Sequence, residues 1–424
     1  MRNDCQRRVL RAGRADRIGC ARAALVAGLA SISGVASAAI EMEVKHAPSP
    51  LPTQDGRVLV YELNVRNFED GCRRLVDVRV TGGGVVARRY QGDAIAGNAL
   101  VYDAAMQPAR NPAEGEAALH PVDVPQDGGV VLYFFLTLPD AAPPPAVLRH
   151  ELDFTACADA AATWNTAAHE SPVGNDAPVV VGLPFRGKGW VAGDSVNPGG
   201  VHRRTLIPKR DASGAPITGA FHAPERYAID WVVVDDEARR AIGPVDRNRS
   251  YLAHGKEVIA VADGPIARTR DGMPEGTPPF NPPGQTVETA AGNYVMQDLG
   301  DGHFAFYAHL QPGSLRVREG DHVVRGQVLA LLGNSGNSSE AHLHFHVSDG
   351  DDPLMSEGVP YVFDRYRVDG QADGMNEANG LFEDVERTLP VARLRRMPRS
   401  YSVIDADPAP PSPFEWAFPA CCGP

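Results

Sequence analysis

Residues 342–347, with the sequence HLHFHV, alternate histidines with apolar residues, and this pattern constrains the fold more than any other stretch of the chain. Successive side chains of a β-strand point to opposite faces, so His342, His344 and His346 share one face. The three apolar residues then point into a core. We expect a strand with one packed face and one face of imidazoles. A metal site and a polar surface in solvent are both consistent with that second face.

The composition agrees with a β-rich protein that has many turns. The 424 residues include 43 glycines and 36 prolines, and 43% of the chain is hydrophobic, which is enough for a packed core. Stretches rich in β-branched and aromatic residues at 58–65, 75–82 and 130–138 predict strands. We therefore expect a mainly β protein. Its residues 40–178 should form an immunoglobulin-like β-sandwich, an accessory domain without a catalytic constellation.

Residues 1–38 have the pattern of a signal peptide. Seven arginines precede an uncharged, alanine-rich run, and Ala36, Ser37 and Ala38 fit a cleavage site. The run is too short to span a bilayer, and no second apolar span follows. We expect an exported protein, periplasmic or extracellular, without a stable membrane span.

Charge and cysteine content exclude further classes. The formal net charge of −12 argues against a nucleic-acid partner, because phosphate backbones repel an acidic surface. After signal-peptide cleavage four cysteines remain and no CxxC motif exists, so a cysteine zinc cluster is not expected. In an oxidising compartment we expect Cys72 and Cys157 to form a disulfide. Cys421 and Cys422 have no assigned role.

Single polar residues interrupt two other apolar segments. Asp230 lies in the apolar stretch 227–234, where an ionised carboxylate is costly unless a cation or a metal compensates it. His309 interrupts the stretch 306–310, where a hydrogen-bonded structural histidine is the alternative to a functional one. His202 follows the turn 197–200 and lies in a loop that enters this half of the chain.

The order of these segments resembles the lysostaphin/LytM-type zinc metallopeptidases. A loop histidine, a strand aspartate, YAHL at 307–310, GNSGNS at 333–338 and HLHFHV at 342–347 follow one another as in that family. The resemblance covers roughly residues 189–363 and is closest over 313–347. It implies a LytM-type antiparallel β-sheet peptidase domain at 179–370, followed by a C-terminal extension with a Pro-rich tail at 371–424.

The resemblance also implies the roles of individual residues. It implies one Zn²⁺ per chain, with His202, Asp230 and His344 as ligands and with His309 and His342 as the two assisting histidines. His346 stands where the family usually has a glutamate, and we expect it outside the ligand set.

The first ligand departs from the family pattern. Compact members place the ligand histidine four residues before the aspartate, where this chain has Arg226. His202 lies 28 residues before Asp230, and His222 lies eight before it. We favour His202, because NPGGVHRR at 197–204 resembles the HRR segment of longer members. His222 remains the alternative.

The donor set agrees with hydrolysis. Two imidazoles and one carboxylate leave a fourth position of tetrahedral zinc for water, whose pKa zinc lowers towards neutrality. The chain has no HExxH glutamate, so proton transfer and oxyanion stabilisation fall to His309 and His342. We expect a secreted zinc metalloendopeptidase. The resemblance implies peptidoglycan cross-links or stem peptides as its substrate.

Two other functional classes fit parts of the sequence. A non-catalytic LytM-type regulatory or binding module of the cell envelope is the alternative, although the complete set of five residues argues against it. The stretch 319–327 is similar to biotinyl or lipoyl carriers, but the turn 333–338 has no lysine to carry the cofactor. Enlarged loops at 235–250 and 267–291 are expected to form the walls of a substrate groove.

Overall fold

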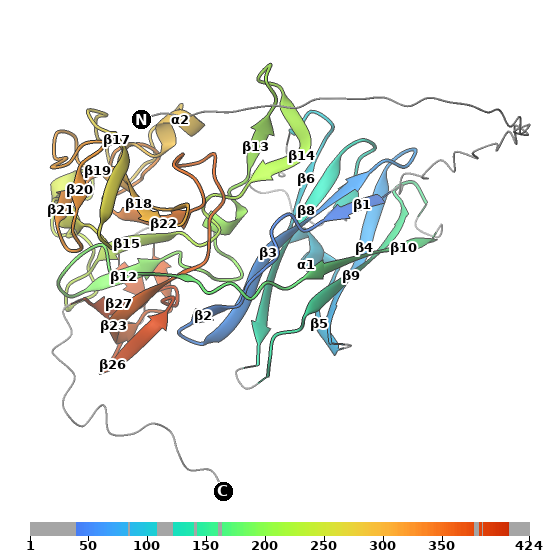
Figure 1. Ribbon diagram of the computed structural model, residues 1–424, viewed down its shortest axis with the longest axis horizontal. Helices are drawn as coiled ribbons and strands as arrows, with labels where there is room; N and C mark the ends of the chain where they lie inside the picture. The colour runs from blue at the N-terminus through green and yellow to red at the C-terminus, as the bar shows by residue number, and fades with distance from the viewer. Residues whose placement is uncertain are drawn as a thin grey trace, which may run out of the picture. The chain divides into compact units, whose positions relative to one another are not determined.

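The computed structural model describes residues 40–83, 85–107, 122–139, 142–159, 163–376, 381–383 and 385–406 (Figure 1). The expected signal peptide and the residues Cys421 and Cys422 lie outside these ranges. Strands predominate, as predicted. Helices in the described ranges are short: α1 (Asp93–Ala96), α2 (Val287–Ala290) and the 3-10 helices η1 (His202–Arg204) and η2 (Asn248–Ser250). Among these residues, no helix has the length and hydrophobicity that crossing a membrane requires.

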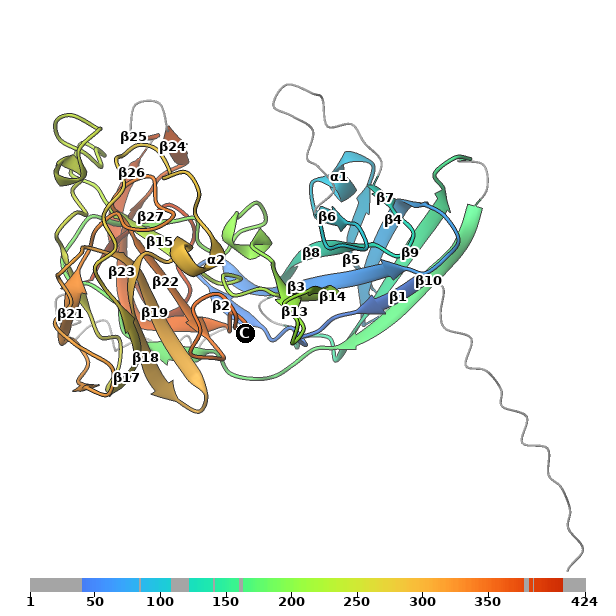
Figure 2. The ribbon, with the colours of Figure 1, turned by 90° about the horizontal axis from the view of Figure 1, so that it is seen from above.

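Residues 40–172 form two antiparallel sheets that enclose one apolar core (Figure 2). The first sheet has the order β1-β3-β8-β6, with β2 paired to β3, and contains β1 (Ile40–Glu43), β2 (Leu51–Thr53), β3 (Gly56–Asn67), β6 (Ala99–Tyr102) and β8 (Gly129–Leu138). The second has the order β10-β9-β4-β5, with β7 paired to β4, and contains β4 (Arg73–Gly82), β5 (Val85–Gln91), β7 (Val122–Val124), β9 (Val147–Ala156) and β10 (Thr163–Pro172).

The predicted strands at 58–65, 75–82 and 130–138 lie in β3, β4 and β8. Side chains from both sheets, among them Leu59, Val78, Phe134 and Leu152, share the core between them. This N-terminal region is therefore a β-sandwich. Its immunoglobulin-like type stays a prediction.

The expected disulfide is present. Cys72 precedes β4 and Cys157 follows β9, and these two strands are direct neighbours in the second sheet. The strand pairing brings the two Cα atoms to 5.6 Å, and the sulfur atoms are bonded. The prediction for Cys72 and Cys157 is confirmed.

The second half of the chain is built on one large sheet. Its order is β11-β23-β27-β12-β15-β22-β19-β18-β17-β20, with β26 paired to β23. The strands are β11 (Val179–Val181), β12 (Trp190–Gly193), β15 (Ile229–Val233), β17 (Gly264–Arg270), β18 (Asn293–Gly300), β19 (His303–Leu310), β20 (His322–Val323), β22 (Leu343–Ser348), β23 (Tyr361–Gln371), β26 (Glu386–Arg396) and β27 (Ser402–Asp405). All pairs are antiparallel except β11 with β23. The predicted antiparallel sheet is confirmed, and β26 and β27 come from the expected C-terminal extension.

Three two-stranded sheets complete the described structure. They pair β13 (Ile207–Arg210) with β14 (Pro216–His222), β16 (Glu257–Ile259) with β21 (Val328–Leu331), and β24 (Gly374–Asn376) with β25 (Leu381–Glu383). The β13–β14 hairpin lies between η1 and β15 in the sequence, and it pairs with no strand of the large sheet.

The register of β15, β22 and β19 places polar residues on one face of the sheet. Asp230 lies opposite His344, and His344 lies opposite Ala308. The neighbouring residues Trp231 and Phe345 are fully buried in the main apolar core. The alternation of side chains along each strand therefore separates the core from the polar face, as the HLHFHV pattern predicts.

Candidate functional site

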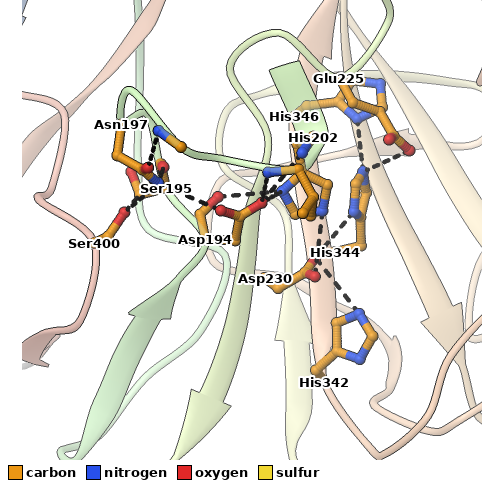
Figure 3. Close-up of polar contacts among 12 residues, drawn as sticks. Asp194, Ser195, Asn197, His202, Glu225, Asp230, His342, His344, His346 and Ser400 are labelled. Carbon is orange, nitrogen blue, oxygen red and sulfur yellow. Dashed lines mark hydrogen bonds and ion pairs between the residues drawn. The ribbon is translucent and has the colours of Figure 1, made fainter. Parts of the chain in front are cut away.

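Three predicted residues come together on the polar face of the large sheet (Figure 3). His202, Asp230 and His344 each offer a ligand atom, and these atoms lie within 4.8 Å of one another. Nε2 of His202 is 3.2 Å from Oδ2 of Asp230, and Nδ1 of His344 is 3.0 Å from Oδ1 of the same carboxylate. Two imidazoles and a carboxylate that converge in this way match the donor set of catalytic zinc sites.

The alternative ligand His222 lies elsewhere. It ends β14, and its Nδ1 is 3.6 Å from Oε1 of Glu357. The group that could hold a metal contains His202 and not His222. A second group of metal-ligand type among the described residues is Cys72, Asp123 and Cys157, but its two sulfurs form the disulfide and are not thiolates.

The imidazoles of His202 and His344 are each held through the nitrogen that faces away from Asp230 (Figure 3). Nδ1 of His202 lies 3.1 Å from the carbonyl oxygen of Asp194 and 3.0 Å from its Oδ2. Nε2 of His344 lies 3.0 Å from Nδ1 of His346 and 3.6 Å from Oε1 of Glu225. Such contacts fix a ring and its tautomer, and they leave the opposite nitrogen for a metal. His346 therefore contacts His344 and is not a member of the group that could hold a metal.

Sequence reasoning misses Asp194 and Glu225. The Asp194 carboxylate accepts hydrogen bonds from the backbone N–H groups of Val201 (3.0 Å) and His202 (3.1 Å), so it shapes the loop that presents His202. Its own φ of 36° lies in the left-handed region. Neither acid belongs to a motif with a fixed spacing. Their only sequence signal is an acidic residue near a turn that leads to a functional segment.

His309 and His342 form the second part of the site. Their ring centroids are 4.6 Å apart, and Nε2 of His342 is 3.5 Å from Oδ1 of Asp230. Nδ1 of His309 is 2.8 Å from the carbonyl oxygen of Ser335, and Nδ1 of His342 is 2.9 Å from that of Glu340. Because a carbonyl only accepts, Nδ1 carries the proton in each neutral ring and Nε2 carries the lone pair. Nε2 of His309 is therefore oriented as a proton acceptor. Nε2 of His342 faces the Asp230 carboxylate; burial would lower the pKa of His342, but this carboxylate raises it.

The backbone at His309 is strained. His309 lies within strand β19 and not in a turn, and its φ is 63°. A non-glycine residue in that region costs roughly 1–3 kcal/mol and persists where the surrounding structure enforces it. Here the backbone N–H of His309 donates to the carbonyl of Ala291, and its carbonyl accepts from Gly333. Strain of this kind concentrates at functional positions.

A buried ion pair between Arg240 and Glu340 supports the segment that leads to His342. The carbonyl of Glu340 accepts the Nδ1–H of His342, and the Glu340 carboxylate lies 3.0 Å from Nε of Arg240. Glu340 is 8% exposed and Arg240 is 6% exposed, so the pair is largely shielded from water. The segment that presents His342 is therefore anchored by charge as well as by the strand.

Burial and the neighbouring charges both shift the pKa values of the site residues. Burial alone would lower the pKa of His202, but Asp230 and Asp194 outweigh burial and raise that pKa well above its usual value. Burial would raise the pKa of Asp230, whereas His202 and His342 hold it well below its usual value. Burial lowers the pKa of His309, and the neighbouring His342 and His344 lower it further. These directions favour the ionised form of Asp230 and the neutral form of His309.

A cavity of about 420 Å³ opens over these residues. Besides the five predicted residues, its lining includes Thr205, Glu225, Asn281, Ala291, Phe306 and Leu354. The loop 267–291 thus forms part of the wall, as expected. The loop 235–250 contributes none of the described lining residues, so the expectation that it forms a wall is wrong for this cavity. Its Asn248 donates to the carbonyl of Gly276 in the other loop (2.9 Å).

Comparison with known proteins gives an independent view of this region. The model of the family described as Peptidase family M23 matches residues 250–355. The peptidoglycan DD-endopeptidase ShyA of Vibrio cholerae is 31% identical over 144 residues, which make up 32% of this chain and 29% of that protein.

Two solved structures are also similar. The catalytic domain of the antimicrobial peptidase lysostaphin from Staphylococcus simulans is 19% identical, with 36% of this chain and 85% of the other covered, at a TM-score of 0.20. A zinc-containing peptidase from Vibrio cholerae is 14% identical, with 75% of this chain and 84% of the other covered, at a TM-score of 0.19.

The family match covers three of the five predicted site residues. This chain spans 29% of the length of the curated relative, so the comparison concerns one region of each protein. The segment matched by the family model holds His309, His342 and His344, whereas His202 and Asp230 precede it. The resemblance inferred from the motifs is confirmed over residues 250–355, the segment that the model of Peptidase family M23 matches.

Proposed function

We propose that this chain is an exported zinc metalloendopeptidase that hydrolyses peptide bonds in peptidoglycan cross-links or stem peptides. The observation that carries the proposal is the convergence of His202, Asp230 and His344 beside two histidines, His309 and His342, whose Nδ1 atoms are held by backbone carbonyls. The family match supports peptidase chemistry. The name of the Vibrio cholerae relative, a peptidoglycan DD-endopeptidase, supports the substrate class.

The donor atoms fit one zinc ion per chain. The ligands would be Nε2 of His202, a carboxylate oxygen of Asp230 and Nδ1 of His344, because these atoms face one another while the other ring nitrogens contact Asp194, His346 and Glu225. When bound, zinc supplies the Lewis acidity that makes water nucleophilic near neutral pH and polarises a peptide carbonyl.

The two remaining histidines handle protons in this proposal. Nε2 of one of the pair His309 and His342 accepts the proton of the attacking water, while its Nδ1–H stays on a backbone carbonyl. The imidazolium that results then gives this proton to the leaving amine, which completes hydrolysis of the amide. The other ring orients the water or, when protonated, donates to the developing oxyanion.

Two features support export. The pattern of residues 1–38 is that of a signal peptide. The disulfide between Cys72 and Cys157 is of a kind that persists in oxidising compartments and is rare in the cytosol. We therefore place the mature enzyme in the periplasm or outside the cell.

The test combines metal content with digestion of a substrate. Purified mature protein should contain about one zinc per chain. It should release soluble peptide-containing fragments from purified peptidoglycan, and a chelator should stop the release until zinc is restored. Zinc binding without digestion would favour the regulatory module instead. Folded protein that was supplied with excess zinc and binds none would refute the proposed site.

A further inference from the structure

His202 is the one member of the ligand group that lies outside the large sheet. Asp230 and His344 are fixed by direct pairing of β15 with β22. His202 begins η1, a helix of three residues, and the hairpin β13–β14 that follows pairs with no other strand of the described structure. Before η1, Asp194 and Asn197 anchor the loop, and Nδ2 of Asn197 is 3.0 Å from Oγ of Ser400. After His202, other contacts must hold the chain.

These contacts come from the β-sandwich. The hydroxyl of Tyr133, on β8, donates to the carbonyl of Arg204 (3.3 Å). Nη2 of Arg204 donates in turn to the carbonyl of Gly97, which follows α1 (2.7 Å). The guanidinium of Arg203 lies 5.8 Å from the ring centroid of Tyr133 and 5.9 Å from that of Phe135. The two residues after His202 are thus both held by the sandwich.

Arg203 makes this contact energetically important. It is only 3% exposed, and its Nη1 donates to the carbonyls of Pro198 (3.2 Å) and Asn197 (3.5 Å). A buried cation is costly unless nearby groups compensate it, and aromatic ring faces attract guanidinium groups within about 6 Å. The rings of Tyr133 and Phe135 therefore help to stabilise Arg203 in its buried position next to His202.

The hairpin after η1 is bound to the same domain. Nδ2 of Asn64 donates to the carbonyl of Gly219 (2.7 Å), and Oγ1 of Thr218 donates to that of Ala104 (3.0 Å). A small apolar cluster joins the two regions, and it includes Tyr102, Met106, Val131, Tyr133, Leu206 and Phe221. The segment from His202 to β14 is therefore bound to the sandwich near both of its ends, at residues 203–206 and 218–221.

We propose that the β-sandwich positions His202 in the metal site, and that Tyr133 is a positioning residue that acts through Arg203 and Arg204. The inference rests on the proposed zinc site and gives the N-terminal domain a role in it. Two ligands come from the large sheet, and the third is held in place by a separate domain. Loosening the sandwich contact would displace His202 from its position and weaken metal binding, although all three ligand side chains would still be present.

The experiment compares two tyrosines of the sandwich in the full mature chain. Tyr133 and Tyr61 are each 2% exposed, but the hydroxyl of Tyr61 is bonded to Nε2 of His150 inside the sandwich. Zinc dissociation constants are measured by competition with a chelator, and the visible spectrum of the Co²⁺ form reports the ligand set. Tyr133→Ala should weaken zinc binding by roughly 10–100-fold, the usual effect of losing a group that orients a ligand. Tyr61→Ala should bind zinc as the wild type does.

A double-mutant cycle separates positioning from general destabilisation. If Tyr133 acts through His202, the Tyr133→Ala change should have no further effect on zinc affinity in a His202→Ala background. Arg204→Ala, which removes the hydrogen bond to Gly97, provides a milder variant if Tyr133→Ala does not fold, and it should weaken zinc binding in the same direction.

The outcomes distinguish the two proposals. Equal zinc affinities for Tyr133→Ala and Tyr61→Ala, or an additive loss in the cycle, would overturn the positioning role while leaving the zinc site intact. With Arg204→Ala as the deciding variant, wild-type zinc affinity would overturn it in the same way. A wild-type protein that binds no zinc would instead refute the proposed function, on which the inference rests.

Discussion

Nδ1 of His344 lies 3.0 Å from Oδ1 of Asp230, and the two residues are direct partners on the neighbouring strands β22 and β15. Backbone pairing thus sets the spacing of two proposed ligands. His202 comes to the same carboxylate from η1, outside the sheet. The proposed metal site therefore combines two residues fixed by strand pairing with one residue on a segment outside the sheet, and the proposed ligands can be tested one at a time.

Removal of a proposed ligand should empty the site. We expect His202→Ala and Asp230→Ala each to weaken zinc binding by more than about 100-fold, beyond the roughly 10–100-fold effect of an outer contact. Equilibrium dialysis against zinc measures this directly. His222→Ala is the matched control, because His222 lies beside Glu357 and outside the group, and it should retain zinc. Loss of zinc in His222→Ala alone would mean that the first ligand is wrongly assigned.

Removal of a proposed acid–base residue should separate binding from chemistry. His309→Ala and His342→Ala should keep near-stoichiometric zinc, because both rings contact backbone carbonyls through Nδ1 and neither belongs to the metal group. Peptide hydrolysis should fall by roughly 10²–10⁴-fold, the usual contribution of a positioned acid–base or oxyanion group. Zinc content and turnover are measured on the same preparations.

Either of two results would contradict these roles. Zinc loss in His342→Ala would show that His342 is a ligand. Turnover at the wild-type rate in both variants would show that His309 and His342 are structural.

The stability of the sandwich should depend on pH through His150. This side chain is fully buried against the hydroxyl of Tyr61, and burial lowers its pKa to about 4. An unfolded chain binds a proton at the same residue near pH 6.5. Between these values the unfolded state binds more protons, so stability is complete above about pH 6.5 and falls as the pH approaches 4.

The shift corresponds to a loss on the order of 3 kcal/mol across that window. Denaturant unfolding at several pH values measures it, with His150→Gln as the comparison. The variant should lack this part of the pH dependence, whatever its absolute stability. Parallel stability curves for the two proteins would show that His150 does not titrate as described.

The disulfide should stabilise the sandwich. It closes a loop with a sequence separation of 85 residues and joins the ends of two paired strands. Removing a native disulfide from a small exported domain typically costs about 2–5 kcal/mol. The Cys72→Ser/Cys157→Ser double variant should show this loss in denaturant unfolding, and a reductant should lower wild-type stability by a similar amount. Unfolding curves that do not differ would contradict a stabilising role.

The parts of the fold that follow from local periodicity could be predicted from the sequence. The alternation at 342–347 predicts the strand β22 and the shared face of its histidines, because the two-residue period of a strand is a local property. The lone carboxylate of Asp230 in an apolar strand likewise predicts a compensating partner. The relation between strands that are far apart in the chain, such as β15 with β22, required the family resemblance as well.

The remaining features depend on contacts that no local pattern encodes. Asp194 and Glu225 reach their imidazoles only after folding, and neither has a diagnostic spacing. The contact of Tyr133 with Arg204 joins residues 71 positions apart, one in strand β8 of the sandwich and one in η1. The strained backbone of His309 arises from hydrogen bonds to Ala291 and Gly333, which come from other segments. These interactions are tertiary, so a single sequence gives no signal for them.

The central claim is that the zinc-bound chain cuts peptide bonds in peptidoglycan. The most direct measurement is mass spectrometry of the fragments released from purified peptidoglycan by zinc-loaded wild type, with zinc-supplemented Asp230→Ala as the control. We predict fragments with a new amino group and a new carboxyl group at one peptide bond, with wild type only. Wild type that holds one zinc per chain and yet releases no such fragments would contradict the account.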